Sequence, residues 1–389
     1  MSNSLASSLD AVLAAGVDGG EVPGVAAVVV DAAGTRYEGA FGERRLGGGD
    51  PMTVDTVGAI FSMTKPLTAA AAMQLVERGL LSLDAPAADV CPELGNVQVL
   101  TGFDPDGQPL TRPAASRVTL RQLLTHTSGF VYDIWNSDVT RWHEVTGVPT
   151  MAFDGRASLA APLAFDPGTA WQYGIGIDWA GVVVEAASGQ SLGAYLADNL
   201  TGPLGMTDTA FTLTSSMESR RSALHVALPD GSYLPVDAPP PERGAFESGG
   251  GGLHGTVTDY GRFIRMMLND GELAGTRVLA PETVVAMSTN QIGDLRVTKL
   301  TTSQPNMSLD YELFEGVPKT WGLSFLINEA PVPTGCPVGT LRWAGLANSY
   351  FWIDRINGIG GASLSQILPF AHPAPIGLAL EVEATVYAA

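Results

Sequence analysis

The stretch Ser62-Met63-Thr64-Lys65 decides how this sequence is interpreted. A serine and a lysine three residues apart lie on one face of the first turn of a helix. A serine hydroxyl is a weak nucleophile until a base accepts its proton. A lysine amine is such a base once burial or nearby positive potential has lowered its pKa. The pattern therefore predicts an acylatable serine, Ser62, at the start of a helix, with Lys65 as its base.

The sequence after the motif predicts a buried helix. Pro66 is tolerated in a first helical turn, and the alanine-rich residues 67–78 are strong helix formers that end at Gly79. By chance alone, S-x-x-K occurs about once or more in a chain of this length, so the motif needs support from elsewhere. The alternative is that Ser62 only caps the helix and that Lys65 lies in solvent.

Composition limits the class of protein. The chain has 389 residues, 45% hydrophobic and 16% charged, which is typical of a compact enzyme with two domains or one composite domain. The net charge of −19 leaves no basic surface for a nucleic acid. No apolar run reaches the roughly 18 residues that span a bilayer, which argues against membrane insertion. The first residues lack the pattern of a secretory signal, so we expect a cytoplasmic protein.

The potential metal ligands are few and scattered. Cys91 and Cys336 match no metal or redox spacing, and we expect them to be buried free thiols. The five histidines form no zinc-binding pattern. We therefore expect neither a metal ion nor a cofactor.

Strand patterns lie at both ends of the chain. Residues 25–30 are continuously apolar, as in a buried strand, and residues 35–41 return from them as a hairpin. Near the other end, residues 341–343, 350–353 and 362–368 have strand patterns. The helical pattern between these groups predicts an α/β (α+β) protein. Its antiparallel β-sheet is built from N- and C-terminal segments, is flanked by helices, and carries an inserted, mainly helical domain.

The change in pattern sets the expected domain boundaries. Residues 1–80 and 215–389 are expected to form the α/β domain, and residues 81–214 the helical insertion. Thr258 is expected to cap a helix with an apolar face that ends near residue 268. The long segment 289–318 is either an active-site lid or simply a mobile loop.

Two further segments carry candidate site residues. Tyr173 follows a turn, and a tyrosine held near a lysine ammonium is stabilised as the phenolate and can act as a general base. The alternative is a half-buried tyrosine that anchors a loop. Gly345 ends a predicted strand and permits close backbone approach. A backbone N–H beside it, with that of Ser62, can form an oxyanion hole; the alternative is a β-bulge glycine.

Two patterns resemble catalytic motifs but are not expected to be catalytic. Residues 189–193 spell G-x-S-x-G, but that motif requires a strand before its serine, whereas here a helix ends at Gly189. We expect Ser191 to cap the next helix. His126 is expected to be a loop histidine bonded to the backbone rather than part of a catalytic triad.

Together these motifs resemble the serine β-lactamase and penicillin-binding-protein superfamily, specifically its class C-like branch and the family VIII carboxylesterases. The resemblance covers nearly the whole chain in the right order. Residues 60–65 resemble the nucleophile motif, 123–129 a stretch common in these proteins, and 247–253 the Gly-rich segment. Tyr173 falls where the family has its Y-x-N tyrosine, and residues 343–345 lie where β-lactamases carry K-T-G.

The chain departs from the β-lactamase pattern at two positions. Ile175 replaces the asparagine of Y-x-N, and Trp343 replaces the lysine of K-T-G. In β-lactamases these polar residues help to hold the amide and carboxylate of the antibiotic. W-x-G is similar to family VIII esterases and to related fungal acyltransferases, so the resemblance implies ester chemistry more than lactam chemistry.

The resemblance implies a role for each site residue. Ser62 forms an acyl-enzyme, and Lys65 and Tyr173 share the role of base, without an indication of which accepts the first proton. The backbone N–H groups of Ser62 and Leu346 bind the oxyanion. The substrate-binding residues are Trp343, Ala344 and Gly345, with Trp343 lining the acyl or alcohol pocket.

We therefore predict a serine carboxylesterase that hydrolyses small or medium acyl esters, with a small-molecule ester as its partner. The alternatives are a β-lactamase or D-amino-acid peptidase, an acyltransferase of the same fold, and a non-catalytic binding protein. The sequence leaves open the physiological ester, its acyl chain length and whether the chain forms a homo-oligomer.

Overall fold

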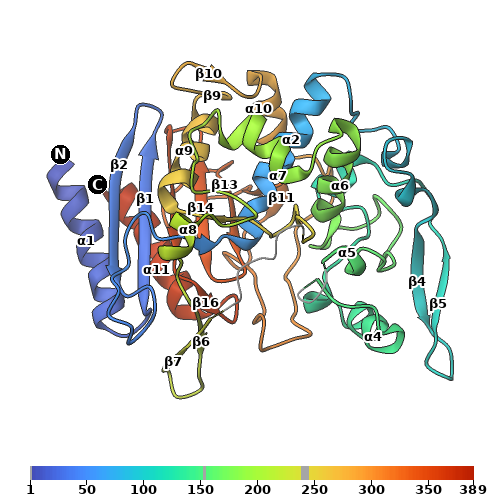
Figure 1. Ribbon diagram of the computed structural model, residues 1–389, viewed down its shortest axis with the longest axis horizontal. Helices are drawn as coiled ribbons and strands as arrows, with labels where there is room; N and C mark the ends of the chain where they lie inside the picture. The colour runs from blue at the N-terminus through green and yellow to red at the C-terminus, as the bar shows by residue number, and fades with distance from the viewer. Residues whose placement is uncertain (1, 152–154, 238–244) are drawn as a thin grey trace.

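The computed structural model describes residues 2–151, 155–237 and 245–389. Both ends of the chain join one seven-stranded sheet, in the order β11-β12-β13-β14-β15-β1-β2, and every neighbouring pair is antiparallel (Figure 1). Its strands are β1 (Gly24–Asp31), β2 (Thr35–Gly42), β11 (Lys319–Trp321), β12 (Leu326–Asn328), β13 (Leu341–Gly345), β14 (Ser349–Asp354) and β15 (Ile359–Leu364). The predicted fold class is confirmed.

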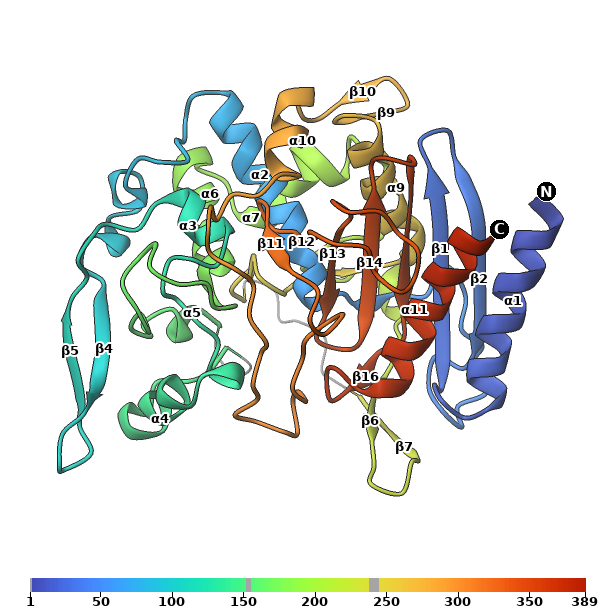
Figure 2. The same cartoon turned by 180° about the vertical axis from the view of Figure 1, so that it is seen from behind.

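Helices cover both faces of the sheet. α1 (Ser2–Asp18) and α11 (Pro373–Ala388) lie side by side on one face, and α9 (Val257–Leu268) packs on the other (Figures 1 and 2). Strand β1 buries alternate side chains in two hydrophobic clusters: Val25, Ala27 and Val29 on the α1/α11 side, and Ala26, Val28 and Val30 on the α9 side. Burial on both faces explains why residues 25–30 are continuously apolar.

The region between the two groups of strands is not purely helical. It contains the antiparallel hairpin of β4 (Gln98–Phe103) and β5 (Pro109–Pro113), which the sequence pattern did not predict and which extends from one end of the molecule (Figure 2). Its helices are α3 (Leu120–Leu124), α4 (Ser137–Thr146), α5 (Gly155–Ser158), α6 (Gly176–Ser188) and α7 (Leu192–Leu196). The division into residues 81–214 and the remainder stays a prediction.

The other described α-helices and strands lie outside the seven-stranded sheet and the inserted region, and α2 among them packs against α6. They are α2 (Lys65–Glu77), α8 (Ser215–Ser219), α10 (Pro281–Met287), β3 (Gly58–Ala59), β6 (Leu224–Ala227), β7 (Tyr233–Val236), β8 (His254–Gly255), β9 (Glu272–Leu273), β10 (Thr276–Arg277) and β16 (Ile367–Leu368). In the described part of the chain, no helix combines the length and the apolar character that crossing a membrane requires.

Two helix caps and both cysteines show how closely local sequence patterns match the structure. Ser191 caps α7 by accepting a hydrogen bond from the Ala194 N–H, as predicted, and both cysteines are free and buried. The predicted cap of α9 was wrong by two residues. Thr256 is the cap, because its hydroxyl accepts the N–H of Asp259, whereas Thr258 lies inside the first turn.

A buried ion pair joins α11 to the sheet. Arg342 of β13 contacts Glu383 of α11 at 3.0 and 3.2 Å, and both side chains are almost fully buried. Glu383 also accepts a hydrogen bond of 2.6 Å from the Thr334 hydroxyl. Removing one partner of such a pair leaves the other charge buried without compensation.

We expect Glu383→Ala to lower the free energy of unfolding by about 3–5 kcal/mol, measured by urea denaturation. The matched control is Glu272→Ala, which removes an exposed pair with Arg277 and should cost less than about 1 kcal/mol. Equal losses in the two variants would show that the buried pair does not anchor α11.

Candidate active site

Ser62 lies in a tight turn between a short strand and a buried helix. Strand β3 pairs with β8, and the chain then forms a 3-10 turn, Phe61–Thr64, that leads into α2. Phe61 has a φ of 43°, which is unusual and strained for a bulky side chain. A hydrogen bond of 3.0 Å from the Ile60 N–H to the Leu253 carbonyl holds the entrance to the turn. The helix cap is Thr64, so the alternative of Ser62 as a simple cap is wrong.

Lys65 is completely buried beside Ser62. Its Nζ lies 3.0 Å from Ser62 Oγ, 3.0 Å from the Tyr132 hydroxyl and 2.6 Å from the Gly250 carbonyl oxygen. It also lies 4.7 Å from the centre of the Tyr173 ring. The side chain is therefore held by three oxygen atoms that come from distant parts of the chain.

Burial lowers the pKa of Lys65 from 10.5 to about 7, and the Asp178 carboxylate partly opposes this shift. A neutral amine can accept a proton from the serine hydroxyl, whereas an ammonium cannot. With a pKa near 7, a large fraction of Lys65 is neutral at physiological pH. Lys65 is thus suited to act as a general base toward Ser62.

Tyr173 lies next to the same pair. It is buried, it forms a hydrogen bond with Ser62, and its hydroxyl accepts a hydrogen bond of 2.9 Å from the Trp343 indole N–H. Burial raises the pKa of Tyr173 well above its usual value, and the hydrogen bonds with Ser62 and Trp343 only partly counteract this. The sequence predicted a stabilised phenolate, but desolvation dominates and favours the neutral phenol.

His126 supports the Tyr173 segment. Its Nδ1 accepts a hydrogen bond of 3.3 Å from the Gly174 N–H, and its ring lies 4.5 Å from the Tyr173 ring between centres. Burial lowers the pKa of His126 well below its usual value, and the nearby Lys65 charge adds to this effect. The predicted backbone-bonded histidine is confirmed.

Sequence reasoning missed two residues of this network, Tyr132 and Asp178. The Tyr132 hydroxyl, which contacts Lys65, donates to Asp178 at 3.2 Å. Asp178 lies in the first turn of α6 and is fully buried, where it also accepts the Gly250 N–H at 2.9 Å and the Ser248 hydroxyl. A β-carbon at Gly250 would lie 2.2 Å from the carboxylate, so only glycine fits this contact.

The end of strand β13 packs directly on the Ser62 turn. A β-carbon at Gly345 would lie 2.5 Å from the Ile60 carbonyl oxygen, which explains the need for glycine. The next residue, Leu346, and Ser62 line the same cavity, and the oxyanion role of their backbone N–H groups stays a prediction. Trp343 lies behind this cavity rather than in its lining, and its indole contacts Tyr173.

A cavity of about 470 Å³ opens beside Ser62. Most of its lining comes from three loops, which supply Tyr132 to Trp135, five residues (Phe246, Ser248, Gly250, Gly251 and Gly252), and three residues (Gln304, Asn306 and Met307). The third loop belongs to the long segment 289–318, which is anchored by a hydrogen bond of 2.7 Å from the Ser303 N–H to the Ile134 carbonyl. This segment is therefore a wall of the cavity.

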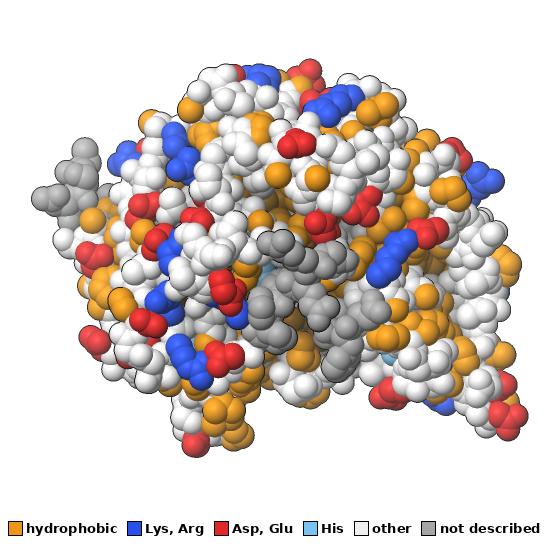
Figure 3. Space-filling model, viewed as in Figure 1, with side chains coloured by type: hydrophobic (Ala, Val, Ile, Leu, Met, Phe, Trp, Pro, Cys, Tyr) orange, Lys and Arg blue, Asp and Glu red, His pale blue; other side chains and the backbone are white. Residues whose placement is uncertain are grey.

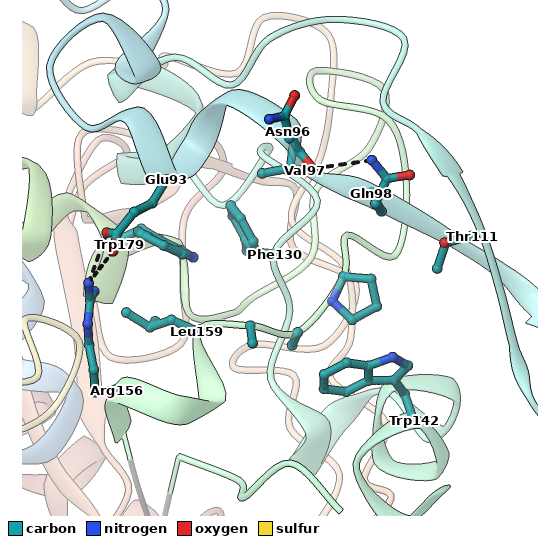
Figure 4. A pocket seen from close by; sticks show the side chains of 13 residues that line it. Glu93, Asn96, Val97, Gln98, Thr111, Phe130, Trp142, Arg156, Leu159 and Trp179 are labelled. Carbon is teal, nitrogen blue, oxygen red and sulfur yellow. Dashed lines mark hydrogen bonds and ion pairs between the residues drawn. The ribbon is translucent and has the colours of Figure 1, made fainter. Parts of the chain in front are cut away.

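A second cavity of about 450 Å³ lies in the inserted region (Figure 4). Its lining includes the aromatic residues Phe130, Trp142 and Trp179 and the ion pair between Arg156 and Glu93, with distances of 2.7 and 2.9 Å. No serine, cysteine, histidine or lysine lines it in the described part of the chain. The candidate chemistry therefore lies in the first cavity.

The sequence profile of the beta-lactamase family matches residues 9–385. The chain belongs to the beta-lactamase family. It is 33% identical to a lovastatin esterase of Penicillium rubens, over 93% of each chain. It is also 30% identical to the esterase EstB of Burkholderia gladioli, over 97% of this chain and 94% of EstB. The acyltransferase mokF of Monascus pilosus is 34% identical, over 72% of this chain and 69% of that protein.

Solved structures show the same fold. Unliganded simvastatin synthase (LovD) from Aspergillus terreus superposes with a TM-score of 0.82, at 28% identity over 99% of this chain and 98% of that one. EstCE1, described as a hydrolase with promiscuous acyltransferase activity, has a TM-score of 0.77 at 21% identity, over 99% of each chain. This family member is thus related to both esterases and acyltransferases.

We expect Gly345→Ala to slow the labelling of Ser62 by a fluorophosphonate probe by at least about tenfold, since its methyl group pushes the Ser62 turn away from β13. The control is Gly377→Ala in α11, where an added β-carbon meets nothing within 4 Å and labelling should be unchanged. Wild-type labelling of a folded Gly345→Ala variant would contradict this contact.

We expect the rate of Ser62 labelling to rise with pH and to level off above about pH 7. The buried lysine is mainly protonated, and hence no base, below that value. Asp178 raises the pKa of Lys65, so Asp178→Asn should move the inflection to lower pH. An exposed acid, Asp50, provides the control Asp50→Asn, which should leave the profile in place. A shift to higher pH in Asp178→Asn would contradict the assignment of Lys65 as base.

Proposed function

We propose that this protein is a serine carboxylesterase that hydrolyses small or medium acyl esters through an acyl-enzyme on Ser62. The observation that carries the proposal is the contact of 3.0 Å between Ser62 Oγ and Lys65 Nζ. The pKa of this lysine, lowered to about 7, allows it to take a proton. Two curated relatives with this fold are named as esterases, which supports the same reaction class.

In the acylation step, Ser62 Oγ attacks the ester carbonyl carbon while Lys65 accepts the hydroxyl proton. The developing oxyanion is stabilised by the backbone N–H groups of Ser62 and Leu346. Collapse of the tetrahedral intermediate breaks the bond to the alcohol, which leaves with a proton. We assign delivery of that proton to the neutral phenol of Tyr173, which regains it from Lys65.

In the deacylation step, water attacks the acyl-enzyme and gives up a proton to the same pair of groups. The carboxylic acid is released and Ser62 regains its proton.

Trp343 favours ester over lactam substrates in this proposal. Its indole N–H bonds to Tyr173 and orients the phenol, in a position where β-lactamases carry a lysine. We assign Trp343, Ala344 and Gly345 to shaping the substrate site from behind. The chain therefore lacks the lysine that would attract the carboxylate of a β-lactam, and we rank lactam hydrolysis lower.

Acyl transfer is the second candidate function. Its support is the identity of 34% to the acyltransferase mokF, with the cavity of about 470 Å³ that gives an acceptor alcohol room beside Ser62. Acylation is the same in both reactions, and only the molecule that accepts the acyl group differs.

We expect Ser62→Ala to abolish hydrolysis of p-nitrophenyl butyrate, measured by release of p-nitrophenolate. Ser191→Ala removes only the cap of α7, so it should retain most of the activity and cost about 1 kcal/mol of stability. Activity that survives in Ser62→Ala and is lost in Ser191→Ala would overturn the proposal.

The same assay separates the alternatives. Faster turnover of a chromogenic cephalosporin than of p-nitrophenyl butyrate would favour a β-lactamase. Acylated products that outnumber free acid when alcohols are added would favour an acyltransferase. Failure of the folded wild-type protein to react with a fluorophosphonate would favour a non-catalytic binding protein.

A further inference from the structure

The cavity beside Ser62 contains one buried carboxylate that the proposed reaction does not use. Asp133 follows Tyr132 directly and is only 6% exposed. Its Oδ2 accepts a hydrogen bond of 2.8 Å from the Gln304 amide, and both residues line the cavity. A carboxylate has about four acceptor sites, so this one neutral donor leaves it able to bind a further group from the cavity.

Among the described residues of this lining, Asp133 is the charged one. Among the described residues that line the cavity, none is a lysine or an arginine. Lys65 lies behind the lining, where Tyr132, Ser62 and Gly250 surround its Nζ. Within the described lining, the Asp133 carboxylate is therefore the group that attracts a cation.

Aromatic side chains surround the same space. Phe61, Tyr132, Trp135 and Phe246 all line the cavity. The faces of aromatic rings attract cations, and they do so most strongly where water is excluded. Aromatic rings combined with one carboxylate are the chemistry that suits an organic ammonium group, which has both a charge and an apolar surface.

The charge of the whole molecule acts in the same direction. The net charge of −19 raises the concentration of cations near the surface and lowers that of anions. Among the described residues on the face drawn in Figure 3, lysine and arginine side chains are dispersed among acidic ones and form no continuous basic patch. Neither the cavity nor this face thus favours an anionic substrate.

From these observations we propose that the preferred substrates are esters carrying an organic ammonium group, which binds between Asp133 and the surrounding aromatic rings. This inference rests on the proposed esterase function and adds the substrate class to it. Gln304 orients the carboxylate, so that Asp133 is the residue that determines specificity.

The experiment compares two esters that differ in charge but hardly in shape, butyrylcholine and 3,3-dimethylbutyl butyrate. Hydrolysis is followed by pH-stat titration at fixed ionic strength, and the readout is the ratio of the two kcat/KM values. We expect wild-type protein to prefer butyrylcholine by about tenfold or more. In Asp133→Asn, which keeps the shape of the side chain and an acceptor for Gln304, the ratio should fall close to one.

Asp50→Asn is the matched control, because it changes the net charge equally at an exposed site away from the cavity. It should keep the wild-type ratio. A wild-type ratio near one, or an unchanged ratio in Asp133→Asn, would overturn the inference. An equal fall of the ratio in both variants would also overturn the inference, because it would show that the long-range field of the net charge, and not Asp133, causes the preference.

A second variant covers the case in which Asp133→Asn fails to fold. Gln304→Lys places an ammonium beside the carboxylate, and its side chain has no other hydrogen-bond partner than Asp133 in the described structure. It should abolish the cation preference and increase kcat/KM for mono-p-nitrophenyl glutarate relative to p-nitrophenyl pentanoate. A retained cation preference would count against Asp133.

The two proposals fail in different ways. If wild-type protein hydrolyses p-nitrophenyl butyrate and the choline ratio is near one, only the cationic substrate class is wrong. If wild-type protein hydrolyses none of these esters, the esterase function itself is wrong, and the ammonium inference fails with it.

Discussion

The burial of the Lys65 amine is the constraint on which the rest of the site depends. An ammonium removed from water is costly unless its charge is paired or given up, and here both responses are visible. The pKa falls to about 7, and three oxygen atoms contact Nζ within 3.0 Å. Asp178 does not contact the lysine but holds two of these partners, Tyr132 and Gly250, in place.

Closing this network requires several distant segments to meet without steric conflict. Gly250 approaches Asp178, and Gly345 approaches the backbone at Ile60, more closely than any β-carbon permits. Phe61, directly before Ser62, has a strained φ of 43°, and the packing around the turn compensates for that strain. The sheet matters for the site because strand β13 places Trp343 beside Tyr173 and Gly345 beside the Ser62 turn. Leu346 follows directly after β13.

Local sequence patterns predicted the parts of the site that depend on local geometry. Ser62 and Lys65 are three residues apart, and the apolar run of β1 and the cap at Ser191 follow equally local rules. Tyr132 and Asp178 were missed because their contacts join residues 46 to 72 positions apart, and no spacing rule connects them. The hairpin of β4 and β5 was missed for another reason, since its second strand is largely exposed and bounded by prolines. The protonation of Tyr173 was misjudged because burial cannot be measured from a sequence.

The division between helices and loops explains how one fold serves several reactions. Lys65, Asp178 and Gly345 lie on helices or a strand, where packing fixes their positions. Asp133, Phe246 and Gln304 lie on loops or a short turn, which tolerate substitution more readily. In the proposed reaction, formation of the acyl-enzyme depends on the first group, and the choice of ester and of acyl acceptor is assigned to the second. Relatives can therefore keep the fold at about 30% identity while being named as esterases in some cases and acyltransferases in others. The fold alone therefore does not determine the substrate of this chain, which depends on the individual residues of the cavity loops.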